Sequence, residues 1–252
     1  MALEVTAPHR PQLTHAVVQD VLELNPRIRV IELSIRDRAF VWSAGQHLDL
    51  ILEDETGAAR RPYSIACAHD QGSPGRVELA IASRPGGRTW SFISRLSRGD
   101  VLAVEGPFGG FRRSPDPTRP LILIAGGTGY APLRALLQAE MLRDPSREAT
   151  LLLGGAVLEE VPWSWELAQE PFARVRAILT LVEPPSGWRG AKGRVTAHLP
   201  ALAAARPHAD FFVSGPQAMI EAVRAALSLA GVHAHRIVEP VAESVEAPRP
   251  AE

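Results

Sequence analysis

One glycine-rich segment follows an apolar run in a way that suits phosphate chemistry. The run LILIA leads directly into Gly126-Gly127-Thr128-Gly129, and Pro132 stands where the first turn of a helix is expected. Glycines allow a sharp turn and the close approach of a ligand, while the amides and dipole of a helix start attract phosphate. The segment predicts a site for a dinucleotide pyrophosphate, although a plain glycine-rich strand-to-helix turn has the same pattern.

A second segment of this kind is Ser214-Gly215-Pro216, which ends the last apolar run before a helix expected to begin at Gln217. Parallel sheets bind ligands at the carboxyl ends of their strands. Both loops are therefore expected to face one crevice, with Gly215 and Pro216 as cofactor contacts. The alternative for Ser214 is that its hydroxyl caps the following helix.

A cation, an aromatic ring and a hydroxyl stand close together in Arg61-Pro62-Tyr63-Ser64, which we expect to open a strand. Arg61 can pair with a phosphate, and Tyr63 can lie against an aromatic ring system. Ser64 can hydrogen-bond a ring nitrogen that accepts hydride. The three residues together fit a flavin, whereas the alternative is a surface arginine followed by a core tyrosine.

The elements around this group predict a small antiparallel barrel in the first half of the chain. Short alternating or β-branched runs are separated by turn residues. Trp90, Ile93 and Leu96 have helical spacing and predict one short helix between two strands. The expected strands are 15–24, 27–35, 47–54, 63–68, 77–83 and 101–106.

The second half of the chain alternates between strand and helix patterns, which predicts a parallel, doubly wound α/β sheet. Its expected helices are 131–144 and 217–231. Between the halves, FRRSPDPTRP is rich in proline and charge and is poor material for either element. We therefore place a domain boundary near Pro115. This gives a first domain over 1–115, a second over 116–240, and a C-terminal tail over 241–252 that we expect to be mobile.

Composition excludes several classes of function. The chain has 27 Lys and Arg residues against 28 Asp and Glu residues, without a basic stripe, which argues against a nucleic-acid partner. Cys67 is the single cysteine, so the chain has neither an internal disulfide nor the four thiolates of a ferredoxin-type cluster. No long apolar window or signal-peptide pattern occurs, so we expect a cytoplasmic protein without a membrane span.

Three other constellations have a structural interpretation. His233 and His235 are expected to share one face of a strand, but they lack a third ligand nearby, so we predict no metal site. Ser64 and Cys67 are expected on a strand, without the strained turn of a catalytic nucleophile. Trp163 and Trp165 are expected to pack under a loop, and the alternative is that they form part of a partner surface.

Several motifs occur in an order that carries more information than any one of them. They are Ala44-Gly45-Gln46, Arg61 to Ser64, PGGRTWSFI from Pro85, GDVLAVEGPFGGF from Gly99, LILIAGGTGYAP from Leu121, and SGPQAM from Ser214. In this order they resemble the ferredoxin–NADP reductase superfamily, over nearly the whole chain. The stretch EPPSGWRGAKGR, at 183–194, is similar to a loop of its short NAD(P)H:flavin reductase branch.

The resemblance implies a flavin barrel followed by a nicotinamide domain, with FAD or FMN and the nicotinamide meeting between them. The residues that it implies for the flavin are Arg61, Pro62, Tyr63, Ser64, Gly87, Arg88, Thr89 and Ser91. Those implied for the nicotinamide cofactor are Gly126, Gly127, Thr128, Gly129, Pro132, Gly215 and Pro216. Ser64, Ser214 and Glu239 are implied as catalytic residues at the hydride-transfer site.

The chain departs from the family pattern at two positions and leaves the donor and acceptor open. Ser214 stands where many members have cysteine, and Val241 where members with tightly bound FAD have an aromatic residue. Glu159 and Glu160 follow LLLGG. Carboxylates at this position would accept hydrogen bonds from the ribose hydroxyls but repel the extra phosphate of NADPH. NADH is therefore favoured over NADPH.

Three functions are compatible with these observations. The chain is a reductase of free flavin, an FAD-bound reductase serving a separate ferredoxin or oxygenase, or a non-catalytic electron-relay subunit.

Overall fold

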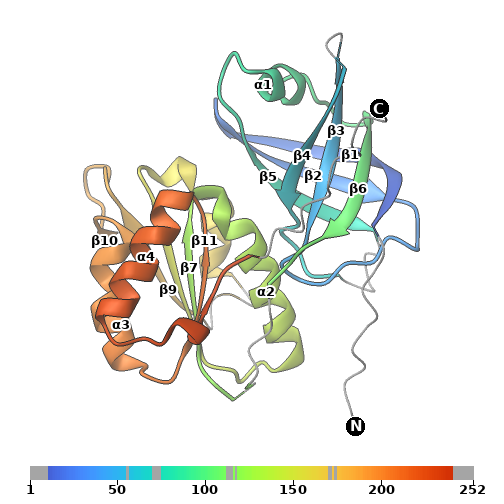
Figure 1. Ribbon diagram of the computed structural model, residues 1–252. Coiled ribbons are helices and arrows are strands. Elements are labelled where there is room, and N and C mark those ends of the chain that lie inside the picture. The colour runs from blue at the N-terminus through green and yellow to red at the C-terminus, as the bar shows by residue number, and fades with distance from the viewer. Residues whose placement is uncertain are drawn as a thin grey trace, which may run out of the picture.

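The computed structural model describes residues 11–54, 57–69, 75–111, 116, 118–169, 172 and 175–240. Figure 1 shows a strand-rich unit from the first half of the chain beside a sheet flanked by helices from the second half. Among the described residues, no helix is both long and apolar enough to cross a membrane. Pro115 and the tail 241–252 lie outside the described residues, so the domain limits 1–115 and 116–240 stay predictions.

The first unit is an antiparallel six-stranded sheet that curls into a barrel, as the sequence predicts. Its strands run in the order β4-β3-β6-β1-β2-β5, and a bridge between Ile65 and Leu79 links the two edges. The predicted short helix is confirmed as α1 (Arg88–Ile93). The strands are β1 (Gln12–Asn25), β2 (Ile28–Ile35), β3 (His47–Asp54), β4 (Gly57–Ser64), β5 (Arg76–Ala82) and β6 (Val101–Phe108).

The prediction for 63–68 was wrong, because Arg61 to Ser64 end a strand instead of opening one. The chain returns from β3 at Gly57 and pairs with it as far as Ser64 opposite His47. Gly57 has a φ of +105°, a left-handed conformation that favours glycine. Because β4 is an edge strand, Pro62 costs no hydrogen bond to a further strand. The chain then bends, so Cys67 does not lie on a strand.

The second unit is the predicted parallel α/β sheet, in the order β10-β9-β8-β7-β11-β12. Its strands are β7 (Leu121–Gly126), β8 (Ala149–Gly155), β9 (Arg176–Leu181), β10 (Ala191–Lys192), β11 (Asp210–Ser214) and β12 (Ile237–Val238). Its helices are α2 (Tyr130–Arg143), α3 (Leu199–Ala205) and α4 (Gln217–Leu229), with the 3₁₀ turns η1 (Gly127–Gly129), η2 (Leu158–Glu160), η3 (Ser164–Ala168), η5 (Val195–His198) and η6 (Ala234–Arg236).

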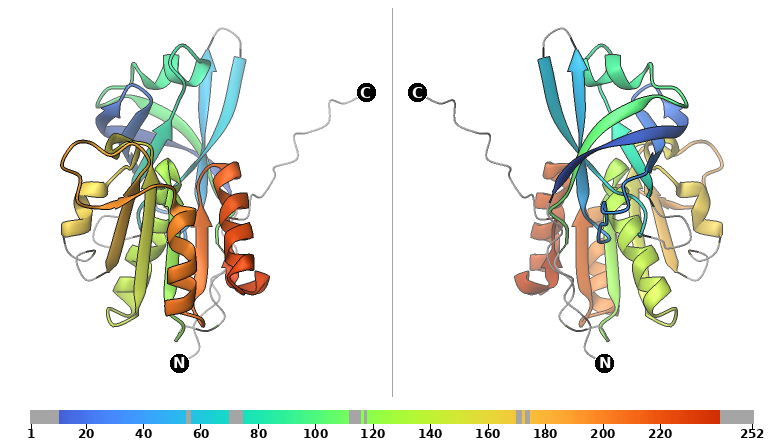
Figure 2. Two further views of the ribbon diagram at one scale, coloured as in Figure 1. Left: turned by 90° about the vertical axis from the view of Figure 1, so that its left-hand side faces the viewer. Right: turned by 90° about the vertical axis from the view of Figure 1, so that its right-hand side faces the viewer.

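Alternate side chains of the central strand β7 pack into two different hydrophobic cores. Ile122 and Ile124 pack with α3 and α4, whereas Leu121 and Leu123 pack with α2 on the other face. Figure 2 shows α2 and α4 on opposite sides of the sheet. The core beneath α2 also takes in three apolar side chains of the first unit, namely Val30, Ala66 and Ala80. This continuous core holds the two units together.

Candidate active site

A pocket of about 450 Å³ lies where the two units meet. The first unit contributes Ser64 from the end of β4, and the second contributes both predicted glycine loops. The convergence expected of these segments is therefore confirmed. The residues that line the pocket are Ile28, Ser64, Ala82, Gly126, Gly127, Thr128, Gly129, Glu160, Ser214, Gly215 and Pro216.

The two glycine loops touch because β7 and β11 are parallel neighbours, with Ala125 opposite Ser214. Gly127 has a φ of +54°, which favours glycine, and a Cβ built on it would approach nothing nearer than the Glu160 carbonyl oxygen at 3.5 Å. Gly127 therefore lines the pocket with its backbone alone. An exposed backbone of this kind at the carboxyl end of a parallel strand fits a nucleotide cofactor.

Two further predictions concern the helices that follow these loops. Pro132 lies in the first turn of α2, as expected, but it is buried and is not among the residues that line the pocket. The helix α4 begins at Gln217 after Pro216, without a side-chain cap. The alternative role of Ser214 as a helix cap is therefore wrong, and Ser214 instead is a buried residue of β11 at the pocket wall.

Strand alternation separates the two arginines of β4. Arg60 forms an ion pair with Glu105 on β6, whereas Arg61 is exposed and its guanidinium donates to the Arg60 carbonyl oxygen (3.0 Å). Side chains of neighbouring strand residues point to opposite faces. Arg61 is thus available for a phosphate on a face that Arg60 does not share.

Tyr63 connects β4 to the start of α1. Burial raises the pKa of its phenol, although the charge of Arg61 and a hydrogen bond with Thr89 lower it in part. The phenol therefore stays neutral at physiological pH. Its partner Thr89 belongs to the first turn of α1, so the structure brings three predicted flavin residues, Arg61, Tyr63 and Thr89, into one neighbourhood.

The other predicted residues of α1 form its first turn and its link to β4. Gly87 precedes the helix, and the Ser91 hydroxyl donates to the Gly87 carbonyl oxygen (3.2 Å). The Arg88 guanidinium donates to the carbonyl oxygen of Gly57, the first residue of β4. These residues lie outside the 450 Å³ pocket, and their contact with a flavin stays a prediction.

Glu239 directly follows β12 and is not among the residues that line the pocket. Its carboxylate is held by the Arg224 guanidinium of α4, with distances of 2.6 and 2.7 Å. Val238, the neighbour of Glu239, pairs with Phe212 of β11, the strand that ends at Ser214, and the catalytic role of Glu239 stays a prediction.

The histidine pair is not on a strand, contrary to the prediction. His233 and His235 flank the start of the turn η6, with their rings stacked 5.6 Å apart, and they line a separate pocket with Arg119 and Arg236. In the part of the chain that the structure describes, no group of three His, Cys, Asp or Glu residues could hold a metal ion. The structure gives this pair no link to the crevice.

The tryptophans of the η3 region differ in exposure. Trp163 is buried against Tyr130, as expected, but Trp165 is 44% exposed, so its predicted burial was wrong. Trp165 lines a pocket of about 450 Å³ together with Trp188 of the 183–194 loop.

Sequence reasoning missed two wall residues of the crevice, Ile28 and Ala82. They face each other across β2 and β5. Each is an ordinary apolar strand residue, so nothing in its type signals a site.

Comparisons with known proteins agree with this geometry. Residues 16–112 match the family model "Oxidoreductase FAD-binding domain", and residues 123–225 match "Oxidoreductase NAD-binding domain". The ferredoxin–NADP reductase B of Sorangium cellulosum is 34% identical over 215 residues, covering 81% of this chain and 86% of the relative.

Two further relatives are longer than this chain. Reductase component 1 of a Comamonas terephthalate 1,2-dioxygenase is 35% identical over 150 residues, which are 58% of this chain and 43% of that protein. The Amycolatopsis cytochrome P450 reductase GcoB superposes with a TM-score of 0.80 at 27% identity, covering 92% of this chain and 70% of that structure.

Proposed function

Because this chain belongs to the ferredoxin–NADP reductase superfamily of NAD(P)H-dependent FAD oxidoreductases, we propose that it oxidises NADH with FAD held on its barrel and passes the electrons to a separate protein. The observation that carries this proposal is the crevice itself. Ser64 from the barrel and Gly126 to Gly129 from the parallel sheet line one pocket. Two ring systems held from opposite walls of such a pocket would meet face to face.

The residues present fit this use of the site. Arg61 and the first turn of α1 would hold the FAD phosphates, Tyr63 would stack on the ring, and Ser64 would donate a hydrogen bond to a ring nitrogen. The glycine loops would hold the nicotinamide cofactor, with Gly215 and Pro216 beside its ring. Bound FAD would supply the hydride-accepting and electron-releasing chemistry of the reaction. The protein supplies alignment and keeps Ser64 in place as a donor.

The donor is proposed to be NADH because carboxylates flank the crevice beyond β8. Glu160 lines the pocket, and its carboxylate accepts a hydrogen bond from the Ala156 amide (2.9 Å), which fixes its place. Glu159 is its neighbour in the turn η2. A fixed negative charge disfavours the additional phosphate of NADPH.

The acceptor is proposed to be a separate iron–sulfur protein or oxygenase. With one cysteine, these 252 residues cannot supply the four thiolates of a ferredoxin-type cluster. The named relatives are a ferredoxin reductase, a dioxygenase reductase component and a P450 reductase. An acceptor centre for this chain would therefore lie outside it.

An absorbance spectrum of the purified protein, followed by titration with NADH and NADPH, tests the proposal. We expect bound FAD in about one copy per chain and a higher kcat/KM with NADH. A colourless protein that takes up no FAD, or a higher kcat/KM with NADPH, would contradict the corresponding part of the proposal.

One observation favours a second candidate, the reduction of free flavin. Val241 stands where members of the family with tightly bound FAD have an aromatic residue that covers the flavin ring. An uncovered flavin would exchange with solution. Gel filtration distinguishes the two functions, because FAD that leaves the protein on the column, with NADH oxidation restored by free FMN or riboflavin, would favour the second.

A further inference from the structure

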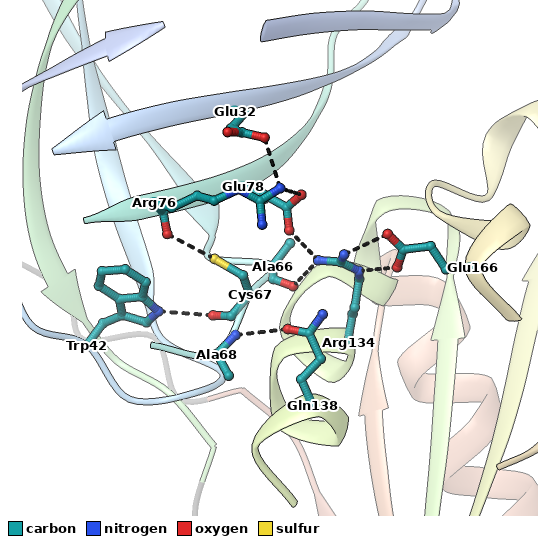
Figure 3. A network of polar contacts seen from close by, with 10 residues as sticks. All are labelled: Glu32, Trp42, Ala66, Cys67, Ala68, Arg76, Glu78, Arg134, Gln138 and Glu166. Atoms are coloured by element: carbon teal, nitrogen blue, oxygen red, sulfur yellow. Dashed lines mark hydrogen bonds and ion pairs between the residues drawn. The ribbon is translucent and has the colours of Figure 1, made fainter. Parts of the chain in front are cut away.

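One buried arginine contacts residues of both domains, as Figure 3 shows. Arg134 lies on α2 and is 4% exposed. Its Nη1 donates to Glu78 Oε2 (2.7 Å) and to the Ala66 carbonyl oxygen (2.8 Å), which both belong to the barrel. Its Nε and Nη2 donate to the two carboxylate oxygens of Glu166, each at 2.8 Å, in the second domain.

Arg134 and its partner Ala66 are close in the chain to residues of the two crevice walls. Ala66 follows Ser64 by two residues, and α2 begins directly after Gly129. One turn further along α2, Gln138 Oε1 accepts a hydrogen bond from the Ala68 amide (3.0 Å). The segment that carries Ser64 is therefore tied at two points to the helix that follows the glycine loop.

The surroundings of the guanidinium fix its orientation. Arg76 donates to the other oxygen of Glu78 (3.0 Å), and the Trp163 ring lies 4.7 Å from the guanidinium carbon of Arg134. The guanidinium is planar, and it binds Glu166 through one edge and Glu78 through another. These directional hydrogen bonds allow few other orientations of its partners. A lysine would keep the charge but lose this directional set. The contact of Arg134 with Glu78 and Glu166 therefore fixes the angle between the two domains and also holds them together.

We propose that Arg134 is a positioning residue, which holds the two domains in the arrangement that places Ser64 opposite Gly126 to Gly129. It touches neither loop itself and acts through Ala66, Glu78 and the start of α2. The consequence for electron transfer rests on the proposed function, because a displacement of about 1 Å between reacting groups can slow a reaction by about 10²-fold.

The chain offers a matched control in Arg147. It is also buried, and it forms an ion pair with Glu140 of α2 while donating to the Arg119 carbonyl oxygen. All of these residues belong to the second domain. Arg147→Met therefore removes a buried ion pair of the same kind without changing the contact between domains.

Distances between spin labels test the proposal independently of activity. Val101→Cys on β6 (62% exposed) and Leu229→Cys at the end of α4 (91% exposed) place one label on each domain. Cys67 stays unlabelled because burial raises the pKa of its thiol to about 12. We expect a narrow distance distribution in the parent and in Arg147→Met, and a broadened or shifted one in Arg134→Met. An unchanged distribution in Arg134→Met would overturn the proposal.

A second variant covers the case in which Arg134→Met does not fold. Glu78→Gln changes the same contact from the barrel side and keeps the size of the side chain. It should broaden the distances in the same direction, and distances as narrow as those of the parent would count against the proposal.

Rapid mixing of FAD-loaded protein with NADH gives the kinetic readout. In Arg134→Met we expect the limiting rate of flavin reduction to fall by roughly 10- to 100-fold with little change in FAD affinity. Arg147→Met should keep the parental rate, and an equal loss in both variants would indicate a general structural effect and overturn the assignment. If the parent itself fails to reduce its flavin, the proposed function fails, while the label distances still decide the role of Arg134.

Discussion

Gly129 lies directly against Gly215, so that the two glycine loops share one van der Waals surface. A Cβ built on Gly129 would be 2.5 Å from Gly215 Cα and 2.5 Å from the Ser214 carbonyl oxygen. Because these are backbone atoms, no side-chain rotation relieves the contact. The close approach of β7 and β11 at the crevice therefore depends on the absence of a side chain at this position.

The first prediction is that Gly129→Ala forces the loops apart. We expect the free energy of unfolding to fall by about 1–3 kcal/mol and KM for NADH to rise. Gly126→Ala is the control for stability alone, because its Cβ would meet Met219 Sδ at 2.5 Å, in a flexible side chain, and Pro216 Cδ at 3.3 Å. Chemical denaturation measures the loss of stability in both variants, and steady-state kinetics measures KM in Gly129→Ala. Equal losses of stability in the two variants would contradict this account of the loop contact.

Ser64→Ala should slow flavin reduction while leaving cofactor binding largely intact. The hydroxyl is the polar side chain that the barrel places in the crevice, and a lost hydrogen bond worth roughly 1 kcal/mol corresponds to a rate loss of roughly 5-fold. Ser146→Ala is a suitable control, since its hydroxyl donates to Asp144 Oδ1 (2.6 Å) and it is not among the residues that line the crevice. An unchanged single-turnover rate in Ser64→Ala would remove this residue from the mechanism.

Arg61→Ala should weaken FAD binding, whereas Arg60→Ala should not. The two residues are neighbours in β4, but Arg60 is paired with Glu105 and Arg61 is exposed on the other face. Loss of a charge-assisted hydrogen bond to phosphate, worth about 1.5–3 kcal/mol, predicts a roughly 10- to 100-fold rise in the Kd for FAD. Titration of the apoprotein with FAD measures it. Similar Kd values for the two variants would contradict the phosphate assignment.

The thiol of Cys67 should make stability depend on pH in the alkaline range. Burial, and then the negative charge of Glu78, raise its pKa from 9.0 to about 12. Above pH 9.0 the unfolded chain loses this proton while the folded protein keeps it. The folded state then binds more protons, so the free energy of unfolding falls as pH rises, by at most about 1.4 kcal/mol per pH unit.

Cys67→Ala isolates this effect from other titrating groups. The stability of the parent relative to Cys67→Ala should decrease between about pH 8 and about pH 10 in parallel denaturation experiments. A difference that stays constant over this range would show that the buried thiol ionises as readily as an exposed one.

The fold was predictable where local pattern and tertiary contact agree. Alternation in 47–54 and helical spacing around Trp90 produced β3 and α1, because each element buries the face that its period defines. The course of 57–68 was not predictable in this way. Pairing with β3 decides where β4 ends. Of the apolar residues after Ser64, Ala66 packs in the core beneath α2, whereas Ile65 and Cys67 pack in the barrel core.

Parts of the crevice carried a sequence signal and parts did not. The loop Gly126 to Gly129 was recognisable because few structures other than a tight turn need so many glycines. Ile28 and Ala82 were not, since they reach the pocket only through the meeting of two domains. Arg134 gave no signal either, because a lone arginine in a helix reads as a surface residue until its partners Glu78 and Glu166 are seen.

The most direct test of the central claim is anaerobic rapid mixing of the FAD-loaded protein with NADH, followed through the absorbance of oxidised flavin. If the crevice between Ser64 and Gly127 brings the two rings together, the absorbance should disappear completely within one turnover, at a rate within the range of about 1–10³ s⁻¹ that is common for enzymes. A flavin that stays oxidised although both cofactors are bound would contradict the account.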